Sequence, residues 1–255
     1  MNKLSDKETL RYSRHLLLKE VGLEGQLALK AATVAVVGAG GLGSPALLYL
    51  AAAGIGTLIL IDDDAVELSN LQRQVLYKVN HLGQNKVTAA GKVLTSLNNQ
   101  IEIVTHCKKL DDNNAGELLK NADIVLDCSD NFAARYSVNR YCFTHKLPLI
   151  AGAAIASRGQ LMGFDFRQNS SPCYGCVFAK SDAAPAVNCS SAGVISPLLG
   201  IIGSMQAQLT LNMLLGHVEG SVFISFDAQC VVFFLSLAGN CRSPKSFCYS
   251  SLTFR

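Results

Sequence analysis

Charged side chains are scarce in this sequence. Asp, Glu, Lys and Arg together make up 16% of the 255 residues, while hydrophobic residues make up 49%. A chain of this composition can bury a large core, so the composition argues against a disordered protein. The net charge is only +3, and no long run of Lys or Arg occurs, so nothing indicates a nucleic-acid partner.

The N-terminal region lacks the continuous apolar centre of a secretory signal. Residues 1–20 are charged throughout, which predicts a cytoplasmic protein. The nine cysteines are then expected to be reduced. They are interpreted as packing residues, metal ligands or reactive thiols rather than as a disulfide framework.

One uncharged stretch, residues 192–215, is long enough to cross a bilayer. It contains Gln206, Gln208 and Asn212, whose polar amides are costly inside lipid. We therefore favour a buried core or interface helix over a membrane helix, with the part through Pro197 leading into it.

Short β-branched runs alternate with helical segments in the first part of the chain. A strand predicted over Thr33–Val37 is followed by a helix over Ser44–Ala53 and a strand over Thr57–Ile61. This order is that of the βαβ unit of a parallel sheet. The alternation continues with helices over 86–97, over 113–119 and up to 145, and with strands over 101–107, 123–127 and 147–151.

After residue 151 the pattern changes. Residues 160–167 and 221–237 alternate as strands do, and a cysteine-rich loop, 169–193, lies between them. The chain begins with a capping-box spacing at Ser5–Glu8 that predicts a helix. The predicted fold class is α/β: a doubly wound Rossmann-like sheet, parallel in its N-terminal half, continued by antiparallel strands and preceded by N-terminal helices.

A glycine-rich turn follows the first predicted strand. Gly38, Gly40 and Gly43 match the G-x-G-x-x-G pattern, which lets a backbone approach a phosphate at a helix N-terminus. Asp62 ends the second strand, where a carboxylate can accept hydrogen bonds from ribose. These features support an NAD-dependent dehydrogenase equally well, and a tight turn without a ligand is the alternative.

The next charged residues distinguish these alternatives. Arg73 and Lys86 converge on the same end of the predicted sheet, which suits a triphosphate better than a bridging pyrophosphate. Asp130, at the end of a third parallel strand, could hold Mg²⁺. The alternatives are solvated bases and, for Asp130 with Asn131, a helix N-cap.

Several short strings occur together and in order: Arg11–Arg14, Gly38–Gly43, Leu68–Gln74, Asp127–Asn131 and Cys173–Cys176. In this combination the chain closely resembles the bacterial E1-like ThiF/MoeB/HesA family, the activating enzymes of thiamin and molybdopterin biosynthesis. The resemblance extends from about Leu4 to Asn240. It implies an adenylyltransferase that uses ATP and Mg²⁺ to adenylate the C-terminal glycine of a ubiquitin-like sulfur carrier ending in Gly-Gly, with release of pyrophosphate.

The resemblance also implies roles for individual residues. Arg14 would reach the triphosphate of a neighbouring subunit, which makes the active unit a homodimer. From the charge and the polar amides noted above, neither a membrane nor a nucleic acid is expected as a partner. The residues implied in the nucleotide site are Gly38, Gly40, Gly41 and Gly43 in the loop, Asp62 at the ribose, Asn70, Arg73 and Lys86 at the phosphates, and Asp130 with Asn131 at the metal.

Two groups of cysteines have implied roles. Cys189 resembles the thiol of the family's crossover loop, which can attack the acyl-adenylate or form a persulfide link; an inert thiol is the alternative. Cys173 and Cys176 resemble half of a structural Zn²⁺ site. The other half would be Cys241 and Cys248, whose spacing departs from the usual C-x-x-C, so a lost site is the alternative.

The resemblance implies a single E1-like adenylation domain over residues 1–255. Its nucleotide-binding half spans about 1–152, and its carrier-binding and zinc half spans about 153–255. Asp62–Asp64, Gln160–Met162 and Asn188–Cys189 favour the thiamin pathway slightly over the molybdopterin pathway. A dehydrogenase would leave the string at 70–74 unexplained, and a non-catalytic nucleotide-binding module would not need Arg14, Arg73, Lys86 and Asp130 together.

Overall fold

A mixed β-sheet runs through the described part of the protein. The computed structural model describes residues 3–168, 170–178, 193–229 and 232–237. The sheet has eight strands in the order β3-β2-β1-β4-β5-β6-β7-β8. The strands are β1 (Thr33–Val37), β2 (Thr57–Ile61), β3 (Glu102–His106), β4 (Ile124–Asp127), β5 (Leu149–Ile155), β6 (Arg158–Phe164), β7 (Ser221–Asp227) and β8 (Val232–Leu237).

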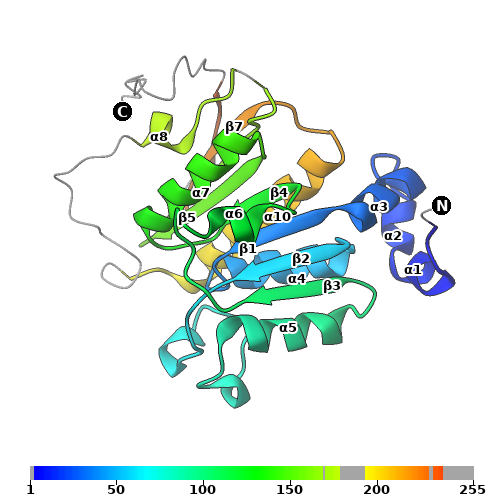
Figure 1. The fold of residues 1–255 in the computed structure, drawn as a ribbon, viewed down its shortest axis with the longest axis horizontal. Helices are drawn as coiled ribbons and strands as arrows, with labels where there is room; N and C mark the ends of the chain where they lie inside the picture. Colours follow the sequence, from blue (N-terminus) through cyan, green and yellow to red (C-terminus); the bar gives the residue numbers. More distant parts are fainter. Residues whose placement is uncertain (1–2, 169, 179–192, 230–231, 238–255) are drawn as a thin grey trace.

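Strands β1 to β5 pair in parallel, and β6, β7 and β8 add in antiparallel fashion (Figure 1). The predicted fold class is therefore confirmed. The strand order reverses between β1 and β4, where the chain first builds outward through β2 and β3 and then returns to the other side of β1. Such a reversal leaves a crevice at the carboxyl ends of the strands.

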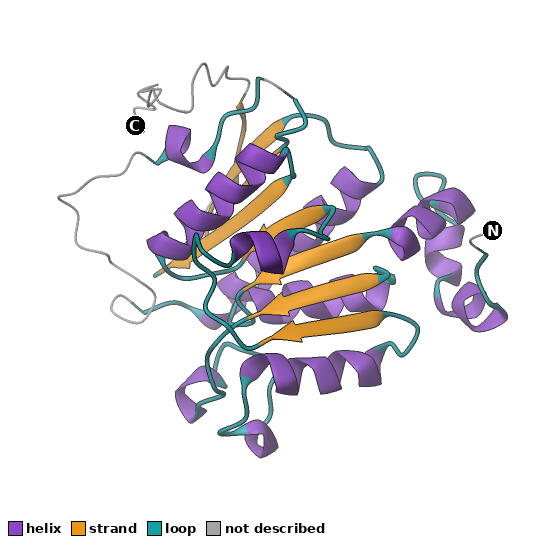
Figure 2. Cartoon of the chain, in the orientation of Figure 1, coloured by secondary structure: helices purple, strands orange, loops and turns teal. Residues whose placement is uncertain are grey.

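Helices cover both faces of the sheet (Figure 2). They are α1 (Asp6–Arg11), α2 (Ser13–Leu16), α3 (Gly22–Ala31), α4 (Gly43–Ala53), η1 (Leu68–Asn70), η2 (Val79–His81), α5 (Lys86–Leu97), α6 (Ala115–Leu119), α7 (Phe132–His145), α8 (Tyr174–Val177) and α10 (Ser196–Leu214). Successive residues of β1 alternate between two cores: Val34 and Val36 pack in the core that includes α4, α5 and α10, while Ala35 and Val37 pack in the core that includes α6 and α7. Burial on both faces explains why this strand is a continuous apolar run.

The uncharged stretch at 192–215 contains the buried helix α10, which spans Ser196–Leu214. Gln206 is fully buried there, and its side-chain amide donates to the carbonyl oxygens of Asp127 (3.0 Å) and Ile150 (3.4 Å). This buried amide is therefore hydrogen-bonded to backbone carbonyls of both β4 and β5. Gly203 allows a close approach, because an added Cβ would lie 2.3 Å from the carbonyl oxygen of Leu42. Across the described ranges, no helix has the length and apolarity needed to cross a membrane.

Several predicted boundaries shift. The expected strand over 147–151 is β5, which continues to Ile155, and β6 begins at Arg158 rather than at residue 160. The two strands form a tight hairpin in which Ile155 pairs with Arg158, and Ala156 takes a positive φ of 50° in the turn. The small residues of β5 carry no β-branched pattern, so the sequence signal ended too early.

The N-terminal region contains three short helices where the sequence analysis described the start of one. The capping box is confirmed: the Ser5 hydroxyl accepts from the Glu8 N–H at 3.3 Å, and the Glu8 carboxylate accepts from the Ser5 N–H at 2.7 Å. Helices α1 to α3 lie beyond the amino ends of the parallel strands (Figure 1), away from the crevice.

Candidate active site

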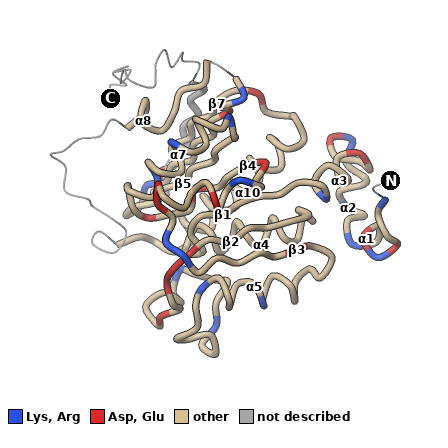
Figure 3. Tube along the Cα trace, viewed as in Figure 1, with Lys and Arg blue, Asp and Glu red and all other residues tan. Residues whose placement is uncertain are grey.

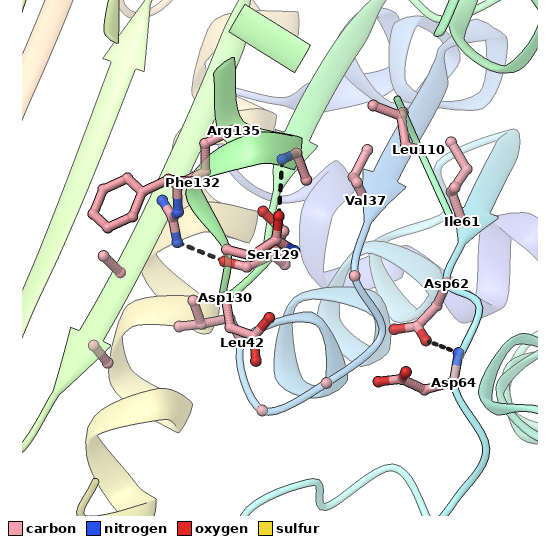
Figure 4. Close-up of a pocket in the computed structure, with 18 of the residues that line it drawn as sticks. Val37, Leu42, Ile61, Asp62, Asp64, Leu110, Ser129, Asp130, Phe132 and Arg135 are labelled. Atoms are coloured by element: carbon pink, nitrogen blue, oxygen red, sulfur yellow. Dashed lines mark hydrogen bonds between the residues drawn. The ribbon is translucent and has the colours of Figure 1, made fainter. Parts of the chain in front are cut away.

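A cavity of about 420 Å³ lies at the carboxyl ends of the parallel strands. It occupies the crevice where the strand order reverses between β1 and β4 (Figure 4). Its lining includes most of the residues predicted for the nucleotide site: Gly38, Gly40, Gly41, Asp62, Arg73, Lys86, Asp130 and Asn131. Segments that are distant in the sequence therefore meet where parallel α/β sheets bind ligands.

The glycine-rich loop needs glycine for steric reasons. Gly38 has a φ of 93°, and a Cβ there would lie 2.7 Å from the carbonyl oxygen of Cys128. A Cβ on Gly43 would lie 2.1 Å from the carbonyl oxygen of Gly38, so Gly43 permits the tight entry into α4. Gly43 does not line the cavity. The loop can therefore take this shape only with these residues.

The peptide groups of Ala39 are held on both sides. The Ala39 N–H donates to the Asp62 carboxylate (2.8 Å), and the Ala39 carbonyl accepts from the buried Tyr77 hydroxyl (2.8 Å). Asp62 also accepts from the Asp64 N–H (2.9 Å). Burial raises the pKa of Asp62, against the opposing effect of the Lys86 charge, and burial also raises the pKa of Tyr77. Two separate segments thus fix the shape of the loop.

Basic side chains surround the cavity. The Lys86 ammonium is buried and pairs at 2.7 Å with Asp64, whose side chain is 66% exposed. The Arg73 guanidinium donates to the carbonyl of Ser69 (2.9 Å). Lys108 and Lys109 follow β3 and line the cavity together with the acidic run Asp62–Asp64. Figure 3 shows basic and acidic stretches of the chain next to each other at this edge of the sheet. Arg73 and Lys86 were predicted from the sequence, whereas the lysine pair was not.

Asp130 and Asn131 have different environments. The Asn131 side chain accepts from the Ala134 N–H (2.9 Å) and caps α7. Asp130 is exposed, and its carboxylate points toward the glycine-rich loop (Figure 4). The N-cap role therefore belongs to Asn131, and the Asp130 carboxylate faces the cavity.

Besides Gly43, the predicted nucleotide residues Asn70 and Arg14 do not line the cavity. Asn70 is buried and accepts from the Glu67 N–H (3.2 Å), which closes η1. Arg14 lies exposed on α2, beyond the amino ends of the strands (Figure 1). Within one chain the structure therefore does not bring Arg14 to the cavity.

The Cys173 and Cys176 sulfur atoms lie 3.5 Å apart at the start of α8. A hydrogen bond from the Cys176 thiol, helped by backbone N–H groups, lowers the pKa of Cys173 to about 6. Neither thiol lines the cavity, but Tyr174 and Phe178 from the same segment do. Cys189, Cys241 and Cys248 lie outside the described residues.

Arg135 was not singled out from the sequence, although it lines the cavity and is 6% exposed. Its Nη1 atom lies 3.9 Å from the buried Asp127 carboxylate. Arg135 lies within a helix that carries another arginine, Arg140, on its exposed side. No periodicity in the sequence separates the two, so only the packing identifies Arg135.

Known proteins resemble the chain over most of its length. The sequence pattern of the ThiF family matches residues 12–236. The molybdopterin-synthase adenylyltransferase of Escherichia coli (strain K12) is 46% identical over 236 residues, covering 91% of this chain and 94% of that protein. The adenylyltransferase and sulfurtransferase MOCS3 of Aedes aegypti is 46% identical over 85% of this chain, which spans 49% of that protein's length, about half. A crystal structure of Escherichia coli MccB with ATP matches with a TM-score of 0.78 and 25% identity, over 93% of this chain and 74% of that one.

We predict that Tyr77→Phe lowers the free energy of unfolding by about 1 kcal/mol, because it leaves the Ala39 carbonyl without its buried donor. Urea unfolding followed by circular dichroism measures the loss. Tyr49→Phe is the matched control, since Tyr49 is 60% exposed. An equal loss in both variants would contradict a specific role for the Tyr77 hydroxyl.

Proposed function

The chain belongs to the ThiF family, and from this premise we propose that it uses ATP to adenylate the C-terminal glycine of a ubiquitin-like sulfur carrier. The observation that carries the proposal is that Asp62, Arg73, Lys86 and Asp130 line one cavity at the reversal of the sheet. Asp62, Arg73 and Lys86 lie in the segment between β2 and β3, and Asp130 follows β4. A nucleoside triphosphate with its metal requires this combination of charges.

The residues that line the cavity suit the chemical groups of ATP. The glycine-rich loop ends at α4, whose N-terminal N–H groups and positive dipole end favour a phosphate. Asp62 accepts from the ribose hydroxyls. Arg73 and Lys86 neutralise the β- and γ-phosphates, for which Lys86 must share or leave its contact with the exposed Asp64. Asn70 remains a predicted phosphate ligand, although it does not line the cavity.

The site also fits Mg²⁺. The ion takes hard oxygen ligands and is commonly held by one or two carboxylates together with substrate phosphates. The Asp130 carboxylate is exposed and directed toward the glycine-rich loop (Figure 4), so Asp130 would hold the ion there. When bound, Mg²⁺ would neutralise phosphate charge and help to orient the triphosphate.

The reaction needs alignment and charge stabilisation rather than a general base. A carboxylate oxygen of the terminal glycine attacks the α-phosphorus and forms the acyl–phosphate bond. The bond from the α-phosphorus to the bridging oxygen breaks, and pyrophosphate leaves with the electron pair. No proton is transferred, so the work of Arg73 and Lys86 is to stabilise the charge on the leaving pyrophosphate.

The other end of the cavity suits the carrier's tail. Ala153 and Ala154 of β5 line it together with Phe132, Tyr174 and Phe178. Small residues leave room for an extended chain ending in glycine, and the aromatic side chains offer apolar contact to the residues before it.

Cys189 remains a predicted reactive thiol of the crossover loop, with an inert thiol as the alternative. Acid-stable labelling of the protein by the carrier would reveal a covalent link.

The carrier's pathway has two candidates. The similarity to a protein named molybdopterin-synthase adenylyltransferase supports the molybdopterin carrier, whereas the slight sequence preference was for the thiamin carrier. A nicotinamide-dependent dehydrogenase is not favoured, because it gives no role to the convergence of Arg73, Lys86 and Asp130. The same convergence argues against a non-catalytic binding module.

The proposal is tested by ATP–pyrophosphate exchange, with each sulfur carrier supplied separately. We expect exchange that depends on one carrier, because labelled pyrophosphate enters ATP only by attacking the acyl-adenylate formed on that carrier, with release of the carboxylate. Asp130→Asn should lower the exchange rate about 100-fold or more, since it removes the metal's carboxylate. ATP binding without carrier-dependent exchange would exclude both carriers as substrates, and full activity of Asp130→Asn would exclude the metal assignment.

We further propose that Arg14 completes the site of a second copy in a homodimer. The support is its position beyond the amino ends of the strands, away from the cavity of its own chain (Figure 1). Arg14→Ala and Arg73→Ala should each be inactive as homodimers. In an equal mixture, random subunit exchange makes half of the dimers mixed, each with one intact site, so about a quarter of wild-type activity should return.

The control for this experiment is a mixture of Arg73→Ala with Lys86→Ala. Both residues belong to the cavity of their own chain, so every site in every dimer lacks one of them and no activity should return. Subunit exchange is verified with differently tagged chains. No recovery in the first mixture despite exchange would contradict a shared site.

We also propose that Cys173 and Cys176 supply half of a structural Zn²⁺ site, with Cys241 and Cys248 as the other half. The 3.5 Å separation of the two sulfur atoms suits a shared tetrahedral ion, and a pKa of about 6 makes Cys173 a thiolate at neutral pH. We expect about one zinc per chain by atomic emission, lost in Cys173→Ser and in Cys248→Ser. Cys107→Ser, at an exposed thiol, should retain the ion. Zinc retained in Cys248→Ser would remove that residue from the ligand set.

A further inference from the structure

Arg135 is a buried cation close to the proposed metal ligand. It lies in the first turn of α7 and is 6% exposed, whereas Arg140 of the same helix has a side chain that is 60% exposed and pairs with Asp112 at 2.6 Å. A guanidinium is removed from water only where its surroundings supply hydrogen bonds and opposite charge. Its contacts therefore indicate what it holds in place.

The Arg135 guanidinium connects the turn after β4 to the middle of β5. Its Nη2 atom donates to the carbonyl oxygens of Ser129 (2.5 Å) and Gly152 (2.7 Å), and the bond to Ser129 is drawn in Figure 4. Its Nη1 atom lies 3.9 Å from the Asp127 carboxylate and makes no hydrogen bond within the described part of the chain. The two hydrogen bonds to backbone carbonyls are shorter than the ion pair with Asp127, so they orient the side chain.

The Ser129 carbonyl is the link to the cavity. It belongs to the planar peptide group whose nitrogen is that of Asp130, so fixing this carbonyl fixes the direction in which the chain enters Asp130. Ser129 is also held from its other side, because its N–H and hydroxyl donate to Asp127 at 3.0 and 2.6 Å. The following residue, Asn131, is fixed as the cap of α7.

Asp130 therefore lies between two anchored residues. Its own carboxylate makes no hydrogen bond or ion pair among the described residues and is directed toward the glycine-rich loop (Figure 4). The position of this carboxylate consequently depends on the backbone contacts of its neighbours. Among these contacts, the bond from Arg135 is the one that connects Asp130's peptide group to β5.

We propose that Arg135 is a positioning residue that acts through the Ser129 carbonyl to hold the Asp130 carboxylate where it takes a divalent cation. The inference rests on the metal role given to Asp130 in the proposed function. Residues that orient a metal ligand without touching the metal typically change metal affinity or activity by about 10- to 100-fold when replaced. An arginine that only stabilised the helix would not change the metal affinity by this factor.

The test measures ATP binding by calorimetry on the full chain over a series of Mg²⁺ concentrations and in EDTA. Arg135→Lys keeps the buried charge but loses the planar fork that reaches both carbonyls. We expect the Mg²⁺ concentration for half-maximal binding to rise about tenfold, while ATP affinity in EDTA changes little. Arg140→Lys, an arginine replacement on the same helix, should change neither quantity. Equal weakening with and without Mg²⁺ in Arg135→Lys would overturn the proposal.

A double-mutant cycle identifies the route of the effect. If Arg135 acts through Asp130, Arg135→Lys should add nothing to the Mg²⁺ requirement of Asp130→Asn, whereas independent effects would multiply and overturn the proposal. An unchanged Mg²⁺ requirement in Asp130→Asn would contradict the metal role in the proposed function. A raised requirement in Asp130→Asn with none in Arg135→Lys would contradict this inference alone. Arg135→Gln, judged by the same criteria, replaces the lysine variant if that variant does not fold.

Discussion

The close approach of the glycine-rich loop to the end of β4 is the constraint on which the site depends. Parallel pairing of β1 with β4 brings Gly38 beside Cys128, whose N–H donates to the Val37 carbonyl at 2.8 Å. At this distance a side chain on Gly38 would meet the Cys128 backbone at 2.7 Å. With glycine, the loop after β1 and the turn after β4 can share one cavity. Asp62 and Asp130 then lie on either side of the loop (Figure 4).

Buried polar groups, more than apolar packing, set the shape of this edge. The strands themselves are held by a continuous apolar core, but their carboxyl ends carry peptide groups that the sheet does not satisfy. Gln206, Tyr77 and Arg135 each bring donors to such carbonyls from a different element. An unpaired buried carbonyl costs about 1–3 kcal/mol, so these side chains stabilise one arrangement of the site over its alternatives. A site that must align a carboxylate with a phosphate requires such rigidity.

The sequence predicted the parts of the molecule that follow from local patterns. The β-branched run of β1, the glycine-rich turn and Asp62 lie where expected, because periodicity and turn chemistry act over a few residues. The roles of buried polar residues were not predictable in the same way. Gln206 was interpreted only as an argument against a membrane helix, and Arg135 resembled any helical arginine. The partners of these two residues are carbonyls that are remote in sequence, and only the tertiary fold brings them together.

The carboxylates of the cavity raise an electrostatic question, because a triphosphate is itself strongly anionic. Asp64 is compensated by the ammonium of Lys86. Asp62 accepts two backbone N–H bonds, and burial raises its pKa. Asp130, on the other side of the glycine-rich loop, has no compensating bond or ion pair among the described residues. A carboxylate left in this state beside a polyanion would repel it, unless a cation comes with the nucleotide. The lack of compensation at Asp130 is thus a physical reason to expect a cation at this carboxylate when the nucleotide binds.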